Sequence, residues 1–165
     1  TSSWSPLSHS FTASARRRST STGWCGCGSA RNVIENVFSA GWSTTGDFFN
    51  AGGASLVCRF YGSITPGPNS HFYTIDPAEC QALKDLQAAT PATEKRWNFE
   101  SNDFAGTALV GGQCAAGLVP VYRAYNNGYS CGVDSNHRIT ANHAAYLEQV
   151  AKGWAGEGVV MCAPQ

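Results

Sequence analysis

Four residue types with reactive side chains recur in a fixed order along this chain. In the middle of the sequence they are Arg59, Tyr61, His71 and Glu100. A glutamate, a histidine and an arginine that lie together could perform acid–base chemistry, because the histidine and the carboxylate can each carry a proton. The same groups could instead bind a polar ligand, or form an internal network of charge-assisted hydrogen bonds that makes the fold rigid.

The same types return toward the C-terminus, and this repetition bears on the choice between these roles. The second set is Arg123, Tyr125, His137 and Glu157, which follows the first by 64 residues at the arginine and by 66 at the histidine. An enzyme needs one active site rather than one for each repeat. We therefore favour the internal network over a ligand site, and a ligand site over catalysis. We expect neither an enzyme nor a cofactor.

Motifs typical of catalysis and of metal binding are missing from the sequence. It contains no G-x-S-x-G, no H-E-x-x-H and no phosphate-binding loop motif. Cys25 and Cys27 are the only closely spaced cysteines, and they lack the second pair that a zinc finger needs. His137 and His143 do not have the i, i+4 spacing that two metal ligands on a helix favour. We therefore expect no metal site.

The elements that position these residues follow from the sequence pattern. Alternating β-branched and aromatic residues predict strands over 57–61 and 119–125. The sequence from Asp76 to Glu79 predicts a helix start, in which the aspartate caps the helix, a proline occupies the first turn and the glutamate completes a capping box. Gly153 predicts the end of a second helix.

Each set of motifs reads as strand, strand, short helix, strand. We therefore predict an α+β, β-dominated fold built as a pseudo-symmetric repeat of such units, two clear and one partial. Residues 1–28 are an N-terminal arm rich in serine, threonine and arginine, and residues 29–165 are a single repeat domain. Its parts are a partial unit at 29–50, a unit at 54–110 and a unit at 114–164. The partial unit lacks a recognisable opening pair of strands.

Aromatic residues allow a binding role as well as a structural one. Trp42, Trp97 and Trp154 recur at equivalent positions, and we expect them to pack the closing strand of each unit onto its helix. The alternative is that some of them face outward and stack on sugars, beside asparagine side chains in loops. The candidate ligand-binding residues are Arg59, Tyr61, Asn69, His71, Tyr73, Arg123, Tyr125, Asn126, Tyr129 and His137, and the candidate structural residues are Trp42, Trp97, Trp154, Glu100 and Glu157.

The order of these motifs resembles a repeat family of secreted bacterial proteins that is known as a domain of unknown function. Its units have the pattern V-Y-R-x-Y, then H-F-Y-T, then a helix, then G-W-x-x-E-G. The resemblance covers roughly residues 29–164, with the best matches at 57–61, 70–80, 119–125, 135–140 and 153–164. It is specific for the fold. It implies attachment or binding rather than catalysis, because members often carry the domain beside hydrolases or surface modules.

The cysteines point to a compartment. Seven cysteines in 165 residues are typical of a disulfide framework formed in an oxidising environment, so we expect a secreted, extracellular or cell-surface protein. The family resemblance implies that Cys58 pairs with Cys80 and that Cys114 pairs with Cys162.

The remaining cysteines bear on possible partners. Cys131 is the candidate partner of Cys25 or Cys27, and the odd count leaves one cysteine for an intermolecular bond or a free thiol. Self-association through that cysteine is therefore one expected partnership. Binding to a polysaccharide or a cell-surface glycan is the other.

Composition argues against several classes of protein. Lysine plus arginine (11) equals aspartate plus glutamate (11), which argues against a nucleic-acid-binding protein with a broad basic face. No apolar run is long enough to span a membrane. Our leading hypothesis is a non-catalytic secreted or cell-surface module that binds glycan or extracellular matrix. The alternative is a structural subunit of an extracellular filament, sheath or other assembly, and a hydrolase is the third and least favoured hypothesis.

Overall fold

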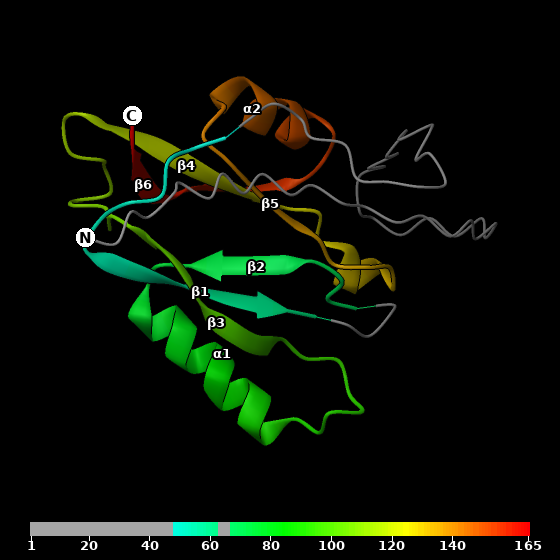
Figure 1. Cartoon of the computed structure of the whole chain (residues 1–165). Coiled ribbons are helices and arrows are strands. Elements are labelled where there is room, and N and C mark those ends of the chain that lie inside the picture. The colour runs from blue at the N-terminus through cyan, green and yellow to red at the C-terminus, as the bar shows by residue number, and fades with distance from the viewer. Residues whose placement is uncertain (1–47, 63–66) are drawn as a thin grey trace, which may run out of the picture.

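The computed structural model describes residues 48–62 and 67–165, in which the elements form two groups of similar order (Figure 1). The first group, called here the first unit, consists of β1 (Ser55–Tyr61), β2 (His71–Thr74), α1 (Pro77–Ala89) and β3 (Asn98–Gly106). The second unit consists of β4 (Leu118–Tyr125), a short 3₁₀ helix η1 (Gly128–Cys131), β5 (His137–Thr140), α2 (His143–Ala151) and β6 (Ala155–Pro164). The predicted arm and most of the predicted partial unit lie outside the described residues.

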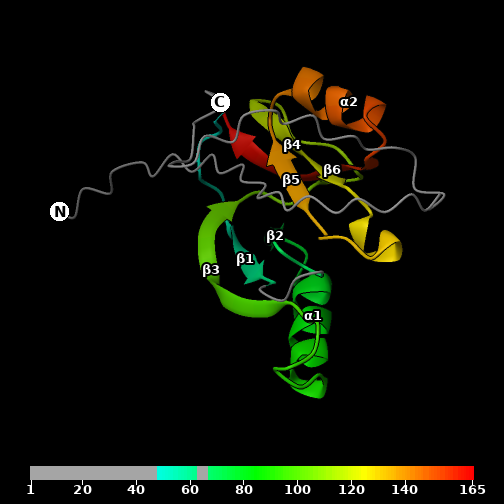
Figure 2. The ribbon, with the colours of Figure 1, turned by 90° about the vertical axis from the view of Figure 1, so that its right-hand side faces the viewer.

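Each unit is a three-stranded antiparallel sheet with one helix. The strand order is β2-β1-β3 in the first sheet and β5-β4-β6 in the second, so the first strand of each unit lies in the middle of its sheet. Figures 1 and 2 show the two sheets between α1 on one side and α2 on the other. The predicted α+β, β-dominated fold class is confirmed.

Both helices begin at a side chain that caps them. The Asp76 carboxylate accepts a hydrogen bond from the Ala78 N–H at 2.8 Å, and the Asn142 side chain accepts one from the Ala145 N–H at 3.1 Å. The predicted capping box is wrong, because a threonine hydroxyl two residues earlier accepts the hydrogen bond from the N–H of each cap residue. Glu79 is therefore not used in the cap, and its carboxylate reaches the second unit instead.

One hydrophobic core is shared by the two units. Val57 of β1, Val121 of β4 and Met161 of β6 are almost completely buried in it. Phe49, which precedes the first unit, packs against the same core, with its ring centroid 5.8 Å from that of Phe104 in β3. Since strands of both units contribute to this core, packing there stabilises each unit against the other.

Backbone hydrogen bonds also join the units at both ends of the sheets. Thr107 and Cys162 exchange two of them, at 3.0 and 2.9 Å. At the other end the Asn69 N–H donates to the Ser135 carbonyl at 3.2 Å, and the Ser135 N–H donates to the Gly67 carbonyl at 2.6 Å. These pairs fix the two sheets relative to each other.

The structure contains both disulfides that the family resemblance implied. Cys58–Cys80 joins β1 to α1, and Cys114–Cys162 joins the segment before β4 to β6. They close loops that are 22 and 48 residues long in sequence.

Two stacked tyrosines hold the second helix where a disulfide holds the first. Tyr122 precedes the arginine of β4 as Cys58 precedes the arginine of β1, and Tyr146 is the fourth residue of α2 as Cys80 is of α1. The two tyrosine rings lie 5.0 Å apart with 23° between their planes. Strand and helix are thus tied covalently in one unit and by aromatic packing in the other.

The double substitution Cys58→Ala/Cys80→Ala should lower the free energy of unfolding by about 3 kcal/mol, because it removes the cross-link from the denatured chain. Cys114→Ala/Cys162→Ala should cost slightly more, about 4 kcal/mol, because its loop is longer. Urea unfolding followed by circular dichroism measures both values. A reversed order of the two costs would show that native-state strain, rather than loop length, sets them.

Candidate functional site

Several of the candidate residues gather on one face of the first sheet. Side chains alternate along a strand, so this face is opposite the one formed by Phe60 and Phe72, which α1 covers. We call it the Arg59 face, and it consists of Arg59, Tyr61, His71, Tyr73, Glu100 and Asp103.

Arg59 is held between two carboxylates on this face. Its Nε lies 2.9 Å from Glu100 Oε2, and its Nη1 donates to Asp103 Oδ1 at 2.9 Å. His71 Nε2 lies 3.2 Å from the same Glu100 oxygen. Burial by itself would lower the pKa of Arg59, but the charges of Asp103 and Glu100 raise it above its ordinary value.

Two irregularities in β3 bring both carboxylates to one arginine. In the register between β1 and β3, Glu100 and Asp103 each fall between two paired residues and have no Cα partner of their own. A β-bulge of this kind bends the strand and re-aims its side chain, and β3 is visibly bent in Figure 2. In β6 the two corresponding positions are occupied by Glu157 and Val160.

Three rings form a row beside this ion pair. The His71 ring lies 4.9 Å from that of Tyr61 and 6.0 Å from that of Tyr73, with interplanar angles of 40° and 30°. Burial, followed by the nearby charge of Asp103, raises the pKa of Tyr73 to about 12. The row is half-buried, and its raised pKa keeps the Tyr73 hydroxyl protonated at physiological pH.

The asparagines that sequence reasoning placed in ligand loops are used within the fold. The Tyr61 hydroxyl donates to Asn69 Oδ1 at 3.3 Å, and Asn69 Nδ2 donates to Asp134 Oδ2 at 3.1 Å. Asn126 donates to the Asp134 carbonyl at 2.8 Å. Tyr129 is different, because it is 62% exposed on η1.

The second set of residues lies between the two units. The Arg123 side chain is only 9% exposed. It donates to Glu157 at 2.7 Å, to the Tyr73 carbonyl at 3.1 Å and to both oxygens of Glu79 at 3.2 Å. Its guanidinium carbon also lies 4.4 Å from the centre of the Phe72 ring. Arg123, which lies in β4, therefore binds β6 of its own sheet and two elements of the first unit.

His137 lies in the same contact between the two units as Arg123, which we call the joint. Its ring stacks on Tyr125 with centroids 4.5 Å apart and meets the Phe72 ring edge-on at 4.9 Å. The side chain is 10% exposed. Burial, followed by the positive charge of Arg123, lowers its pKa to about 3, so the imidazole is neutral at physiological pH.

The two sets thus share their residue types but not their surroundings. Arg123 and His137 are buried in the joint between the units, whereas the side chains of Arg59 and His71 are 29% and 40% exposed. Arg123 takes its second carboxylate from Glu79 of the other unit, while Arg59 takes it from Asp103 of its own unit. Sequence reasoning missed the contact between Glu79 and Arg123, because the two residues are 44 positions apart.

The remaining candidates have structural surroundings or fall outside the described residues. Trp154 is 4% exposed beneath Arg138, whose guanidinium carbon lies 5.1 Å from its ring. Trp97 packs against Phe72, with their ring centroids 5.6 Å apart. Cys131 is disulfide-bonded. Trp42, Cys25 and Cys27 lie outside the described residues.

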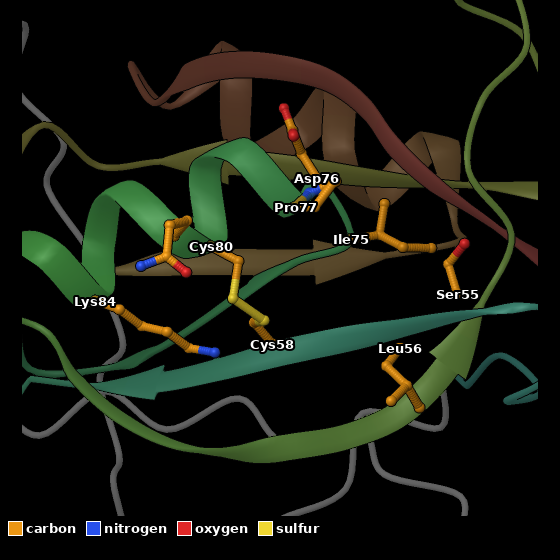
Figure 3. Close-up of a pocket in the computed structure, with 9 residues that line it drawn as sticks. Ser55, Leu56, Cys58, Ile75, Asp76, Pro77, Cys80 and Lys84 are labelled. Atoms are coloured by element: carbon orange, nitrogen blue, oxygen red, sulfur yellow. A yellow bond between two sulfur atoms is a disulfide. The ribbon is translucent and has the colours of Figure 1, made fainter.

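A shallow pocket of about 350 Å³ lies where the first turns of α1 meet β1 (Figure 3). The Cys58–Cys80 disulfide is in its wall, with Lys84 on the helix side and Leu56 on β1. None of the candidate ligand-binding residues lines it. Within residues 48–62 and 67–165, no three histidine, cysteine or acidic side chains are grouped so that they could hold a metal ion. No helix in this part of the chain has the length and hydropathy needed to cross a membrane.

These features define a class of small, disulfide-linked β-rich proteins in which two sheet-and-helix units are joined through a buried arginine. The chain belongs to the family described as Domain of unknown function (DUF5648), whose model matches residues 28–164. No curated protein and no solved structure shows significant similarity to it.

Arg123→Ala should destabilise the protein by about 2–3 kcal/mol, because it removes a buried side chain whose charge-assisted hydrogen bonds to Glu79 and the Tyr73 carbonyl join the two units. Arg59→Ala is the matched control, and its cost should stay near 1 kcal/mol because its ion pairs are partly solvated. Urea unfolding of both variants at a low protein concentration gives the comparison. Equal losses in the free energy of unfolding would show that the two arginines contribute equally to stability.

The low pKa of His137 predicts a loss of stability in acid. Its ordinary value is 6.5, so between pH 6.5 and 3 the unfolded chain binds a proton that the folded chain does not. The stability that the protein gains from holding His137 neutral is therefore complete above pH 6.5 and falls as the pH falls. Relative to His137→Phe, the wild type should therefore lose about 2–3 kcal/mol between pH 7 and pH 4.5.

Urea unfolding of the wild type and His137→Phe at a series of pH values measures this difference. His143→Phe, at the exposed start of α2, is the control and should leave the pH dependence of the wild type nearly unchanged. A His137→Phe variant that still follows the wild-type pH dependence would assign the acid loss to other groups.

Proposed function

We propose that the two units are copies of one module, and that the protein is a non-catalytic, secreted or cell-surface subunit of an extracellular assembly in which such modules dock on one another. Matching positions support the common origin of the units. Arg59 lies opposite Tyr73 in the register of the first sheet as Arg123 lies opposite Ile139 in the second. The strand order, the capped helix start and the bulged glutamate also agree between the units.

The contrast between the two arginine sets carries the proposal. In the second unit, the set around Arg123 binds the edge of a neighbouring unit through a carbonyl, a carboxylate and an aromatic ring. In the first unit, the same residue types form a half-exposed face. The Arg59 face has the same residue types as the set around Arg123, which joins the two units inside the chain. The face is therefore suited to binding a further module.

A binding role fits the chemistry of the Arg59 face better than catalysis does. Glu100 Oε2 lies against both Arg59 and His71, so this oxygen is already engaged within the fold. The pocket in Figure 3 lies on the other side of β1 and contains none of these groups. Secretion is supported by the disulfides, which form and persist in oxidising compartments.

Glycan binding at the same face is the second candidate function. It is favoured by the row of Tyr61, His71 and Tyr73, because aromatic rings flanked by carboxylates suit the apolar faces and hydroxyls of sugars. In this case one chain presents one such site, since the corresponding rings of the second unit are packed in the joint.

Sedimentation velocity of the full chain over a wide range of concentrations tests the assembly proposal, with free thiols blocked so that no new disulfide forms. The wild type should associate, and Arg59→Glu should shift the population to monomer. Lys84→Glu, on the helix that covers the opposite face, is the control and should behave like the wild type. A wild type that stays monomeric throughout would contradict the proposal. Its binding to a glycan array, lost in Tyr61→Ala, would then support the second candidate.

A further inference from the structure

The contacts of Arg123 with the first unit show what kind of surface such an arginine set binds. Arg123 lies over the Phe72 ring and donates to the Tyr73 carbonyl and the Glu79 carboxylate. Phe72 and Tyr73 belong to the outer strand β2, and Glu79 to the first turn of α1. We call these three residues the first receiving edge.

The second unit has an edge at the corresponding positions, with different chemistry. Its outer strand is β5. In this strand Arg138 follows the histidine, and Ile139 lies opposite the arginine of β4. The third residue of α2 takes the place of the glutamate. The second receiving edge therefore consists of Arg138, Ile139 and Ala145. It has the guanidinium of Arg138, half-buried over Trp154 and near Glu148, where the first edge has a ring, and a methyl group where the first has a carboxylate.

The Arg59 face differs from the Arg123 set in a complementary way. It has Asp103 at the bulge position that Val160 occupies in β6. Arg59 therefore obtains two carboxylates from strand β3 of its own sheet and needs none from another unit. Arg59 brings one positive charge to the face, and Glu100 and Asp103 bring two negative charges, an excess that suits the guanidinium of Arg138.

We propose that the Arg59 face of one copy of this chain docks on the second receiving edge of another copy, so that copies join head to tail. This inference rests on the proposed function and names the partner of the same face. Because face and edge are different surfaces, the contact is heterologous and extends to a ring or a filament.

Complementation between two variants tests this geometry. Asp103→Lys changes the face, and Arg138→Glu changes the edge. Each variant alone should associate at least about tenfold more weakly than the wild type, because like charges then meet across the contact. Mixed in equal amounts, they should associate with each other, because every contact between the two variants again joins opposite charges. Sedimentation velocity with one fluorescently labelled partner measures both results.

Milder substitutions and a rescue guard against misfolding. Asp103→Asn and Arg138→Gln should weaken association in the same direction, and near-ultraviolet circular dichroism should confirm that every variant is folded. The exchanged pair Asp103→Arg/Arg138→Asp should associate again. An Arg138→Glu variant that associates like the wild type would overturn the head-to-tail contact while leaving assembly through the Arg59 face intact. A monomeric wild type would instead overturn the proposed function itself.

Discussion

The buried guanidinium of Arg123 is the interaction on which the arrangement of the two units depends. A charge in the interior is tolerated only when its hydrogen bonds are satisfied, and Arg123 achieves this with two glutamates and one carbonyl. Two of these partners, Glu79 and Tyr73, belong to the first unit. Separating the units would leave Glu79 without its ion pair and Arg123 with Glu157 as its remaining partner, so electrostatics adds direction to the non-directional packing of the shared core.

The same residue types have different consequences in the two units because their neighbours differ. Around Arg59, the bulged strand β3 contributes both Glu100 and Asp103, and the ion pairs are complete within one sheet. Around Arg123, Val160 replaces the second carboxylate, so the arginine requires Glu79 from outside its own sheet. One set is therefore a joint, and the other is a self-contained face with excess negative charge.

Much of the local structure was predictable from the sequence. The alternating pattern of 57–61 and the cap at Asp76 identify a strand and a helix start through short-range physics, and the structure has both. The capping box failed because Thr74 competes for the same N–H, a contact that a four-residue pattern does not include. The loop asparagines Asn69 and Asn126 were assigned to ligand binding, but they hold the loops at the joint through their hydrogen bonds to Asp134.

The sequence by itself determined the class of fold, the recurring residue types and, through a family resemblance, two disulfides. These properties depend on local propensity and on motif order, both of which are written along the chain. The tertiary structure alone decided which of two alike arginine sets is buried and which lies at the surface. That choice depends on contacts between residues such as Glu79 and Arg123, which lie 44 positions apart and meet only when the two sheets pack. Burial, and with it the pKa of His137, is a property of that packing rather than of residue type.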